Sequence, residues 1–288
     1  MIAPAVKQSN LFARISALLA ISCMATGVGY SNPNSSASDD VSGSVLTVEI
    51  AKQYLADADS VDTKQFTSIE DAAAEALGKH DGQLNHRGLT SLTDSQAEAL
   101  ARHKGELWLH GLTSLSDSAA EALSSHDGLL NLRGLTDISD STAEALGNHK
   151  GPLGLHGLTD ISDSAAEALG NHKGPLWLHG LTSLSDSQAA FFSNHDGGLA
   201  LGGLTSLSDA AAEALGNHKG YLGLASLTEL SEAAAEALGN HDGDLYLAGL
   251  TSLSDVAAEA LGKNEGEVAV VHSKLPPSAS EILKDAGH

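Results

Sequence analysis

A repeat of 23 residues organises most of this 288-residue chain. Residues 107–128, LWLHGLTSLSDSAAEALSSHDG, show the unit clearly. Its first strand position recurs without slippage at Val61, Leu84, Leu107, Leu130, Leu153, Leu176, Leu199, Leu222, Leu245 and Val268. These starts define nine complete units, and self-similarity at a step of this size is typical of stacked repeat proteins. The sequence therefore predicts one elongated body in which each unit contacts only its neighbours.

Each unit combines a short strand, a turn and a short helix. Leucines alternate with other residues at the start of the unit, so they face one side of a predicted strand. The helix is expected to begin among residues 116–118, with Ser118 and Glu121 as a capping box. Because aromatic residues make up only 3 % of the chain, the core must consist of Leu and Ala.

The pattern LxLxGLTxL followed by a short helix resembles bacterial leucine-rich repeat proteins. The 23-residue step is closest to the bacterial surface-protein type, and the resemblance covers residues 46–288. The chain departs from leucine-rich repeats in three ways. The Asn of the commonest leucine-rich pattern is missing, a leucine comes one residue early in the turn, and His replaces the late apolar or Cys position. The resemblance implies an α/β solenoid: a curved right-handed coil with a parallel sheet on the concave side and short helices on the convex side. Such proteins usually bind other macromolecules.

The two ends of the chain differ from the repeats. Residues 1–30 are predicted to be an export signal peptide, with Lys7 and Arg14 before a short apolar run. Residues 31–45 are predicted to be a disordered linker, because they are polar and small. Residues 46–60 are expected to form an N-terminal cap helix with Thr47 as its N-cap, followed by nine repeats over 61–267 and a C-terminal cap over 268–288.

The expected location is outside the cytoplasm: periplasm, cell surface or medium. Residues 19–23, LAISC, resemble a degenerate lipobox, so a lipid anchor at Cys23 is an alternative to plain secretion. An uncleaved N-terminal anchor is a third reading. Since Cys23 is the single cysteine, no disulfide can form within the chain.

Stacking should align equivalent residues into rows. The row His80, His103, His126, His149, His172, His195, His218 and His241, which ends in Asn264, is interpreted as a packing row. The alternative is a site for zinc, nickel or copper, which imidazole suits. A row of acids from Asp71 to Asp255 is expected to cap helices, with Ca²⁺ as the alternative ligand. The repeated Gly128 position predicts a left-handed turn, and the repeated Thr113 position predicts hydroxyl bonds to turn carbonyls.

The composition limits the function. A formal net charge of −22 argues against nucleic acid, which is bound through Lys and Arg contacts. No Ser/His/Asp set, phosphate loop or HExxH motif is present, so we expect neither enzymatic activity nor a cofactor. The chain is expected to be a monomer. Phe191, in the one helix that lacks the repeated Glu, is either a filler between units or a dimer contact.

The outward positions of the predicted strands vary from unit to unit. They include both tryptophans of the chain, three units and so about 14 Å apart. Trp and Arg are enriched at binding hot spots. We therefore predict a ligand-binding patch for a protein or a glycan, with drift on an exposed sheet, and hence a passive spacer protein, as the alternative. The patch consists of Trp108, His110, Arg133, His156, Trp177 and His179.

Overall fold

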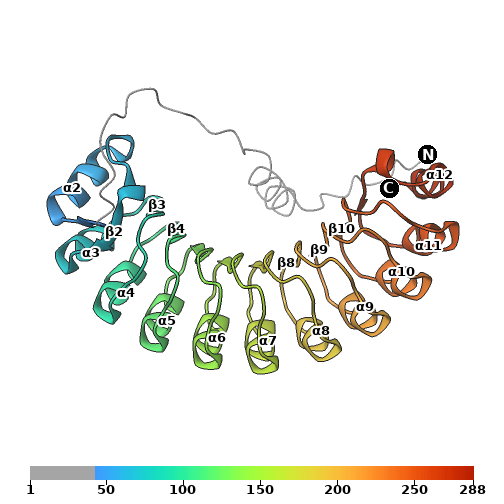
Figure 1. The fold of residues 1–288 in the computed structure, drawn as a ribbon, viewed down its shortest axis with the longest axis horizontal. Helices are drawn as coiled ribbons and strands as arrows, with labels where there is room; N and C mark the ends of the chain where they lie inside the picture. Colours follow the sequence, from blue (N-terminus) through green and yellow to red (C-terminus); the bar gives the residue numbers. More distant parts are fainter. Residues whose placement is uncertain (1–42) are drawn as a thin grey trace, which may run out of the picture. The chain divides into compact units, whose positions relative to one another are not determined.

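The computed structural model describes residues 43–288, which form one unit built of the repeats and their two end caps. The expected signal peptide, Cys23 and most of the linker lie outside the described residues. Within residues 43–288 the chain follows an arc, with short strands along the inner side and helices along the outer side (Figure 1). No helix in this range is both long and apolar enough to cross a bilayer.

Nine two-residue strands make up the inner sheet of the described range. They are β3 (Leu84–Asn85), β4 (Leu107–Trp108), β5 (Leu130–Asn131), β6 (Leu153–Gly154), β7 (Leu176–Trp177), β8 (Leu199–Ala200), β9 (Leu222–Gly223), β10 (Leu245–Tyr246) and β11 (Val268–Ala269). All neighbours are parallel, and every paired residue lies 23 positions from its partner, as in Leu107↔Leu130. The predicted register is therefore confirmed.

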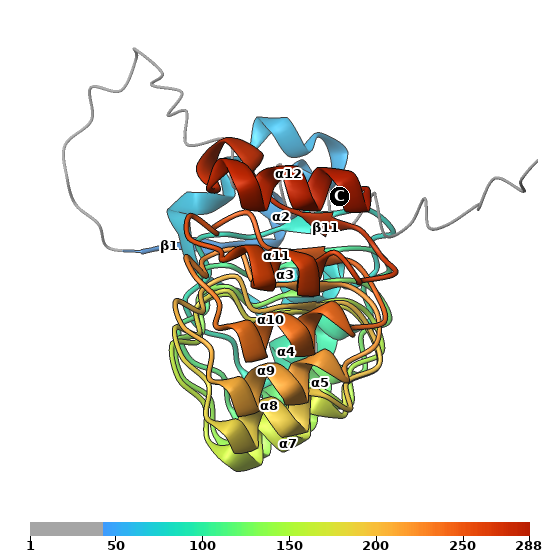
Figure 2. The same ribbon diagram turned by 90° about the vertical axis from the view of Figure 1, so that its right-hand side faces the viewer.

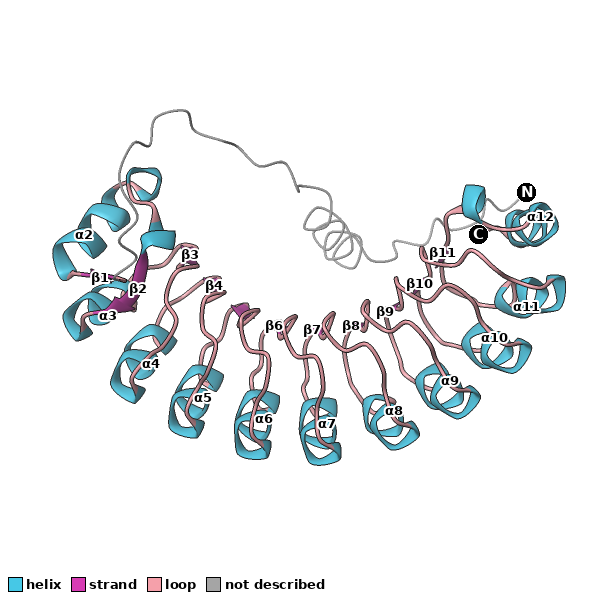
Figure 3. Ribbon diagram, in the orientation of Figure 1, coloured by secondary structure: helices cyan, strands magenta, loops and turns pink. Residues whose placement is uncertain are grey.

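Nine short helices line the outer side of the arc (Figure 3). They are α3 (Asp71–Leu77), α4 (Asp94–Ala101), α5 (Asp117–Ser124), α6 (Asp140–Gly147), α7 (Asp163–Gly170), α8 (Asp186–Phe192), α9 (Asp209–Gly216), α10 (Glu232–Gly239) and α11 (Asp255–Leu261). Viewed along the arc, the successive coils lie one behind another, so equivalent residues form rows (Figure 2). This architecture is the predicted leucine-rich repeat solenoid of α/β class.

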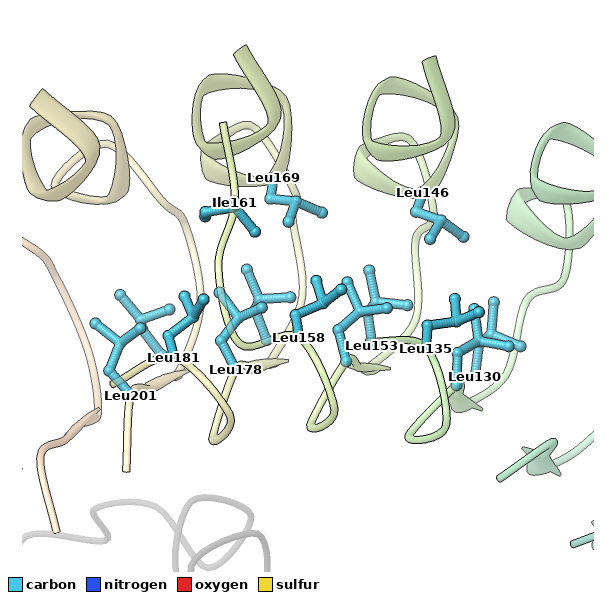
Figure 4. Close-up of a cluster of buried hydrophobic side chains, with 14 of the residues drawn as sticks. Leu130, Leu135, Leu146, Leu153, Leu158, Ile161, Leu169, Leu178, Leu181 and Leu201 are labelled. Carbon is cyan, nitrogen blue, oxygen red and sulfur yellow. The ribbon is translucent and has the colours of Figure 1, made fainter. Parts of the chain in front are cut away.

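The core is a set of leucine rows between the strands and the helices. Figure 4 shows strand leucines such as Leu153, turn leucines such as Leu158 and helix leucines such as Leu169 meeting in one layer. All three are fully buried. The helix also contributes alanines at positions equivalent to Ala120, where a small side chain lets helix and sheet approach closely. In α8, Phe192 takes the buried leucine position and Phe191 is partly buried against the same core, as a filler would be.

The prediction of a first strand at Val61 is wrong. The segment forms two 3₁₀ turns, Ala58–Ser60 and Thr63–Gln65, which are capped by the side chains of Asp57 and Asp62. The unit carries Thr63 where the seven units from Leu107 to Leu245 have a second inward leucine, so apolar burial does not hold it in the sheet. Instead Thr63 donates a hydrogen bond to the Asn85 carbonyl at 2.7 Å and covers the edge of β3.

The N-terminal cap contains a strand as well as a helix. Helix α2 (Val48–Ala56) begins after Thr47, whose side chain accepts from the Ile50 N–H as predicted. Before it, β1 (Ser44–Leu46) pairs in parallel with β2 (Phe66–Ile69) in a separate two-stranded sheet. At the other end, α12 (Pro277–Ala286) follows a short 3₁₀ turn, His272–Lys274, and covers the last coil.

The predicted capping box at Ser118 and Glu121 is wrong. The N-cap of α5 is Ser116, whose Oγ accepts from the Ala119 N–H at 3.0 Å. The row of acids occupies the next position, the first residue of each helix. Six of its nine carboxylates accept a hydrogen bond from the N-cap serine of the following unit, as Asp94 does from Ser116 at 2.5 Å, whereas Asp71 accepts from Gln96 and Asp163 from Ser187. The acids therefore tie neighbouring coils together instead of capping their own helices.

The glycine row at Gly128 has a different cause from the predicted left-handed turn. Among its described members only Gly105, Gly220 and Gly243 have positive φ. A Cβ on Gly128 would instead overlap the carbonyl oxygen of Gly105 in the preceding coil. Close stacking of the turns is therefore what requires glycine. The threonine row behaves as predicted at three places, where the hydroxyl donates to the preceding threonine carbonyl: Thr90 to Thr67, Thr205 to Thr182 and Thr251 to Thr228.

Candidate ligand-binding site on the concave sheet

The six residues predicted to form the ligand-binding patch lie in two adjacent columns on the inner face. We call them the concave patch: Trp108, His110, Arg133, His156, Trp177 and His179. The strand register aligns the column Trp108, Asn131, Gly154 and Trp177. The second column lies two residues further along each coil. Since residues 23 apart are spatial neighbours, it runs His110, Arg133, His156 and His179.

The side chains of the concave patch form two aromatic clusters. In the first, the Trp108 and His110 rings meet edge to face, with centroids 5.1 Å apart. The Trp108 indole N–H donates to Glu106 Oε2 at 3.0 Å. In the second, the His156 ring lies 6.0 Å from the Trp177 ring and 5.0 Å from the His179 ring, measured between centroids.

Arg133 occupies the coil between the two clusters. Its side chain is exposed. The backbone N–H of Arg133 donates to Asn131 Oδ1 at 3.2 Å. Among residues 43–288, no carboxylate lies within ion-pairing distance of its guanidinium. The patch therefore presents an unneutralised cation between two sets of flat rings.

Burial and nearby cations keep the patch histidines neutral. Burial, together with the charges of Arg87 and Arg133, lowers the pKa of His110 to about 4. Burial lowers the pKa of His156 to about 3, with smaller contributions from His179, Arg133 and His110. The pKa of His179 is lowered by burial and then by Arg133. At neutral pH each ring can both donate and accept a hydrogen bond.

Two glycines explain how these rings lie on the sheet. A Cβ on Gly154 would lie 2.9 Å from His156 Cε1, and a Cβ on Gly202 would lie 2.6 Å from His179 Nδ1. The imidazoles therefore occupy the space that a side chain would fill. From the sequence alone, Gly154 and Gly202 show only that these positions have no side chain.

Sequence reasoning missed two residues on or near this face. His86 follows β3 at a position where most units have an inward leucine, and it is fully buried. The centroid of its ring lies 5.0 Å from that of the Tyr54 ring. Burial lowers the pKa of His86 to about 4. The sequence signal that could have identified His86 is the Leu-x-His run from Leu84, which breaks the usual Leu-x-Leu alternation. Tyr221 is the other: it precedes β9, yet its hydroxyl lies over Gly223, and burial raises its pKa to about 12.

The repeated histidine row forms a separate buried stack under the turns. Successive rings are nearly parallel, with centroids 5.7–6.1 Å apart, and His103 to His241 are buried. Nε2 of His126 lies 2.9 Å from the Gly105 carbonyl oxygen, and His149 and His241 repeat this contact. In the described part of the chain, no three His, Cys, Asp or Glu side chains are grouped to hold a metal ion. Both ring nitrogens of His103, His172, His195 and His218 are buried without a partner, so the rings of the row pack against one another more regularly than they bond to turn carbonyls.

Comparison with known proteins yields a fold resemblance only. No family model matches the chain, and no curated protein matches it. Among solved structures, a leucine-rich repeat protein of Leptospira interrogans superposes with a TM-score of 0.48 at 20 % sequence identity. The match covers 76 % of this chain and 56 % of the Leptospira chain. This chain thus spans little more than half the length of that protein.

Proposed function

We propose that this protein is a non-enzymatic scaffold that binds a protein or glycan ligand through the concave patch. The observation that carries the proposal is the contrast between the patch and the repeats around it. Both tryptophans of the chain, an unpaired arginine and three neutral histidines gather where the repeat imposes no residue. Trp and Arg are the side chains most often found at binding hot spots.

The binding test compares two double variants in a pull-down from an envelope extract and on a glycan array. Trp108→Ala/Trp177→Ala removes the flat rings. Val256→Ala/Val45→Ala, which changes the two large apolar side chains exposed in the described range, is the matched control. We expect capture by the wild type and the control and loss of capture by the tryptophan variant. Equal capture by all three would reject the patch, and capture by none would favour a passive spacer protein.

We also propose that the protein is exported and belongs to the bacterial surface-protein type of leucine-rich repeats. The support is the sequence of residues 1–30 and the 23-residue step. Fusion of residues 1–45 to a reporter enzyme that is active only outside the cytoplasm tests export. Metabolic labelling with a radioactive fatty acid, compared with Cys23→Ser, separates a lipid anchor from plain secretion. An inactive fusion would contradict export.

A further inference from the structure

The concave sheet lacks acidic residues in a strongly acidic protein. The chain has 37 Asp and Glu, yet none occupies an outward strand position between residues 85 and 248. Two of its four arginines are among these positions, Arg87 and Arg133. The full set is Asn85, Arg87, Trp108, His110, Asn131, Arg133, Gly154, His156, Trp177, His179, Ala200, Gly202, Gly223, Ala225, Tyr246 and Ala248. Such a distribution favours an anionic ligand on this face.

Arg133 is the centre of this positive region. The Arg87 Nε donates to Asn85 Oδ1 at 3.1 Å, whereas the Arg133 guanidinium has no carboxylate partner in the range 43–288. Glu106, the acid just before β4, accepts from Trp108 and from Gln83. A planar guanidinium that is free to bind two oxygens at once suits a carboxylate.

Flat apolar surfaces lie on both sides of Arg133. Trp108 and Trp177 are three strand spacings apart, about 14 Å, and Arg133 belongs to one of the two coils between them. The direct neighbours of Trp177 in its column are Gly154 and Ala200, so no large side chain of that column covers the indole. Both indoles are half-buried. An extended ligand that presents flat apolar faces on each side of a negative charge would match this arrangement.

The half-buried imidazoles of the patch supply hydrogen-bonding groups. His110 Nε2, His156 Nδ1 and His179 Nδ1 are covered by the protein, so the other nitrogen of each ring is the one available to a ligand. A hydroxyl group both donates and accepts, as a neutral imidazole does. A ligand with hydroxyl groups therefore suits these rings.

We propose that the concave patch binds an acidic polysaccharide whose sugar rings carry carboxylates. A carboxylate pairs with Arg133, flanking sugar rings lie against Trp108 and Trp177, and ring hydroxyls meet the imidazoles of His110, His156 and His179. This proposal rests on the proposed function, because it names the ligand of the same patch.

An acidic polysaccharide fits better than an acidic peptide. A uronic acid ring combines a C–H face, several hydroxyls and a carboxylate in one rigid group, which matches the alternation of indole, imidazole and guanidinium. A peptide carries its charges and its apolar groups on separate flexible side chains, and ordering them costs free energy on binding.

The experiment is isothermal titration of the full chain with four probes. The first is an oligogalacturonate, and the second is its methyl ester, which has the same sugar rings without the charge. The third is a poly-glutamate peptide, and the fourth is a dextran sulfate oligomer, which carries sulfates in place of carboxylates. The variants are Arg133→Gln, Arg133→Lys and, as a control, Arg102→Gln, whose exposed side chain lies at the end of α4 on the other side of the coil.

We expect saturable binding of the oligogalacturonate by the wild type and by Arg102→Gln. Arg133→Gln should weaken binding about 10- to 100-fold, the range for a hydrogen bond to a charged group. Arg133→Lys should lie between the two, because it keeps the charge and loses the paired geometry. The methyl ester should bind as weakly to the wild type as the oligogalacturonate binds to Arg133→Gln.

Three results would overturn the proposal: no binding of the oligogalacturonate by the wild type, equal binding by Arg133→Gln and Arg102→Gln, or tighter binding of poly-glutamate or dextran sulfate. If one of these occurs while capture of a partner still depends on the two tryptophans, the proposed function stands and the ligand class is wrong. If the tryptophan variant also captures normally, both are wrong.

Discussion

The buried histidine stack and the histidines of the concave patch place the same side chain in different settings. In the stack, each ring repeats its neighbour 23 residues away and packs nearly parallel to it, with centroids 5.7–6.1 Å apart. In the concave patch, His110, His156 and His179 share a column with Arg133, and their rings are half-buried and lie beside Trp108 and Trp177. Repetition thus marks the side chains that hold the coils together, and departure from it marks the surface that we propose for a ligand.

The largest expected effect is the loss of folding stability when the histidines of the buried stack are protonated. Burial lowers the pKa of His172 and His218 to about 4, from 6.5 in the unfolded chain. The unfolded state therefore binds more protons below pH 6.5, and folding stability falls as the pH drops from about 6.5 to about 4. Protonation of either ring at about pH 4 should lower the free energy of unfolding by roughly 3 kcal/mol.

Urea unfolding at pH 7 and pH 5 measures this loss. His172→Asn should reduce the difference between the two pH values by roughly 2 kcal/mol, because one titrating ring is gone. Asn264 shows that the amide fits the row, since it donates to the His241 carbonyl and accepts from the Gly266 N–H. His80→Asn, at the half-buried end of the stack, is the control and should change less. An unfolding curve that is the same at both pH values would contradict the account of the stack.

The next effect tests the close approach of the turns. Gly128→Ala should lower the free energy of unfolding by roughly 1–3 kcal/mol or more, because its Cβ would overlap the Gly105 carbonyl oxygen. Gly198→Ala is the matched control, since its Cβ would meet only Tyr221, at 3.6 Å. Chemical unfolding of both variants at pH 7 makes the comparison. Equal stability of the two variants would show that the turns do not pack as closely as described.

A smaller loss of stability should distinguish the observed N-cap of α5, Ser116, from the one expected from the sequence, Ser118. Ser116→Ala should cost about 1 kcal/mol, because Ser116 caps α5 and donates to Asp94 of the preceding coil. Ser118→Ala, which removes an exposed hydroxyl, should change stability by less than about 0.5 kcal/mol. The reverse order in thermal unfolding would favour the capping box that the sequence suggests.

These three cases show what the repeat can and cannot predict. The 23-residue period determines the register, the sheet and the leucine rows, because the period alone decides which residues become neighbours. It does not identify the cap at Ser116, since Ser118 and Glu121 satisfy the same local pattern. It also does not explain Gly128, because the clash there comes from the preceding coil.

The ends of the body and the patch depend on information that the repeat lacks. Val61 has the apolar character of a strand start, yet the aspartates on either side cap 3₁₀ turns and Thr63 lacks the apolar side chain of the following inward position. The positions of the concave patch could be predicted, because alternation places them outward. The orientation of His156 over Gly154 could not, since it depends on a side chain packing across coils.

The smallest effect is expected on the concave face. Arg133→Gln should change the free energy of unfolding by less than about 0.5 kcal/mol, because the guanidinium is exposed and has no carboxylate partner within residues 43–288. Its effect on ligand binding should be far larger. Thermal unfolding of the variant beside the wild type checks this. A large loss of stability would mean that Arg133 serves the architecture and not a ligand.

The most direct test of the concave patch uses the intrinsic fluorescence of the protein. Its only two tryptophans, Trp108 and Trp177, both belong to the patch, so tryptophan emission reports on this surface alone. Titration of the wild type with the oligogalacturonate is predicted to give a saturable change in emission with the same dissociation constant as calorimetry. Calorimetric binding with unchanged emission from both tryptophans would contradict the account, because the ligand would then lie elsewhere.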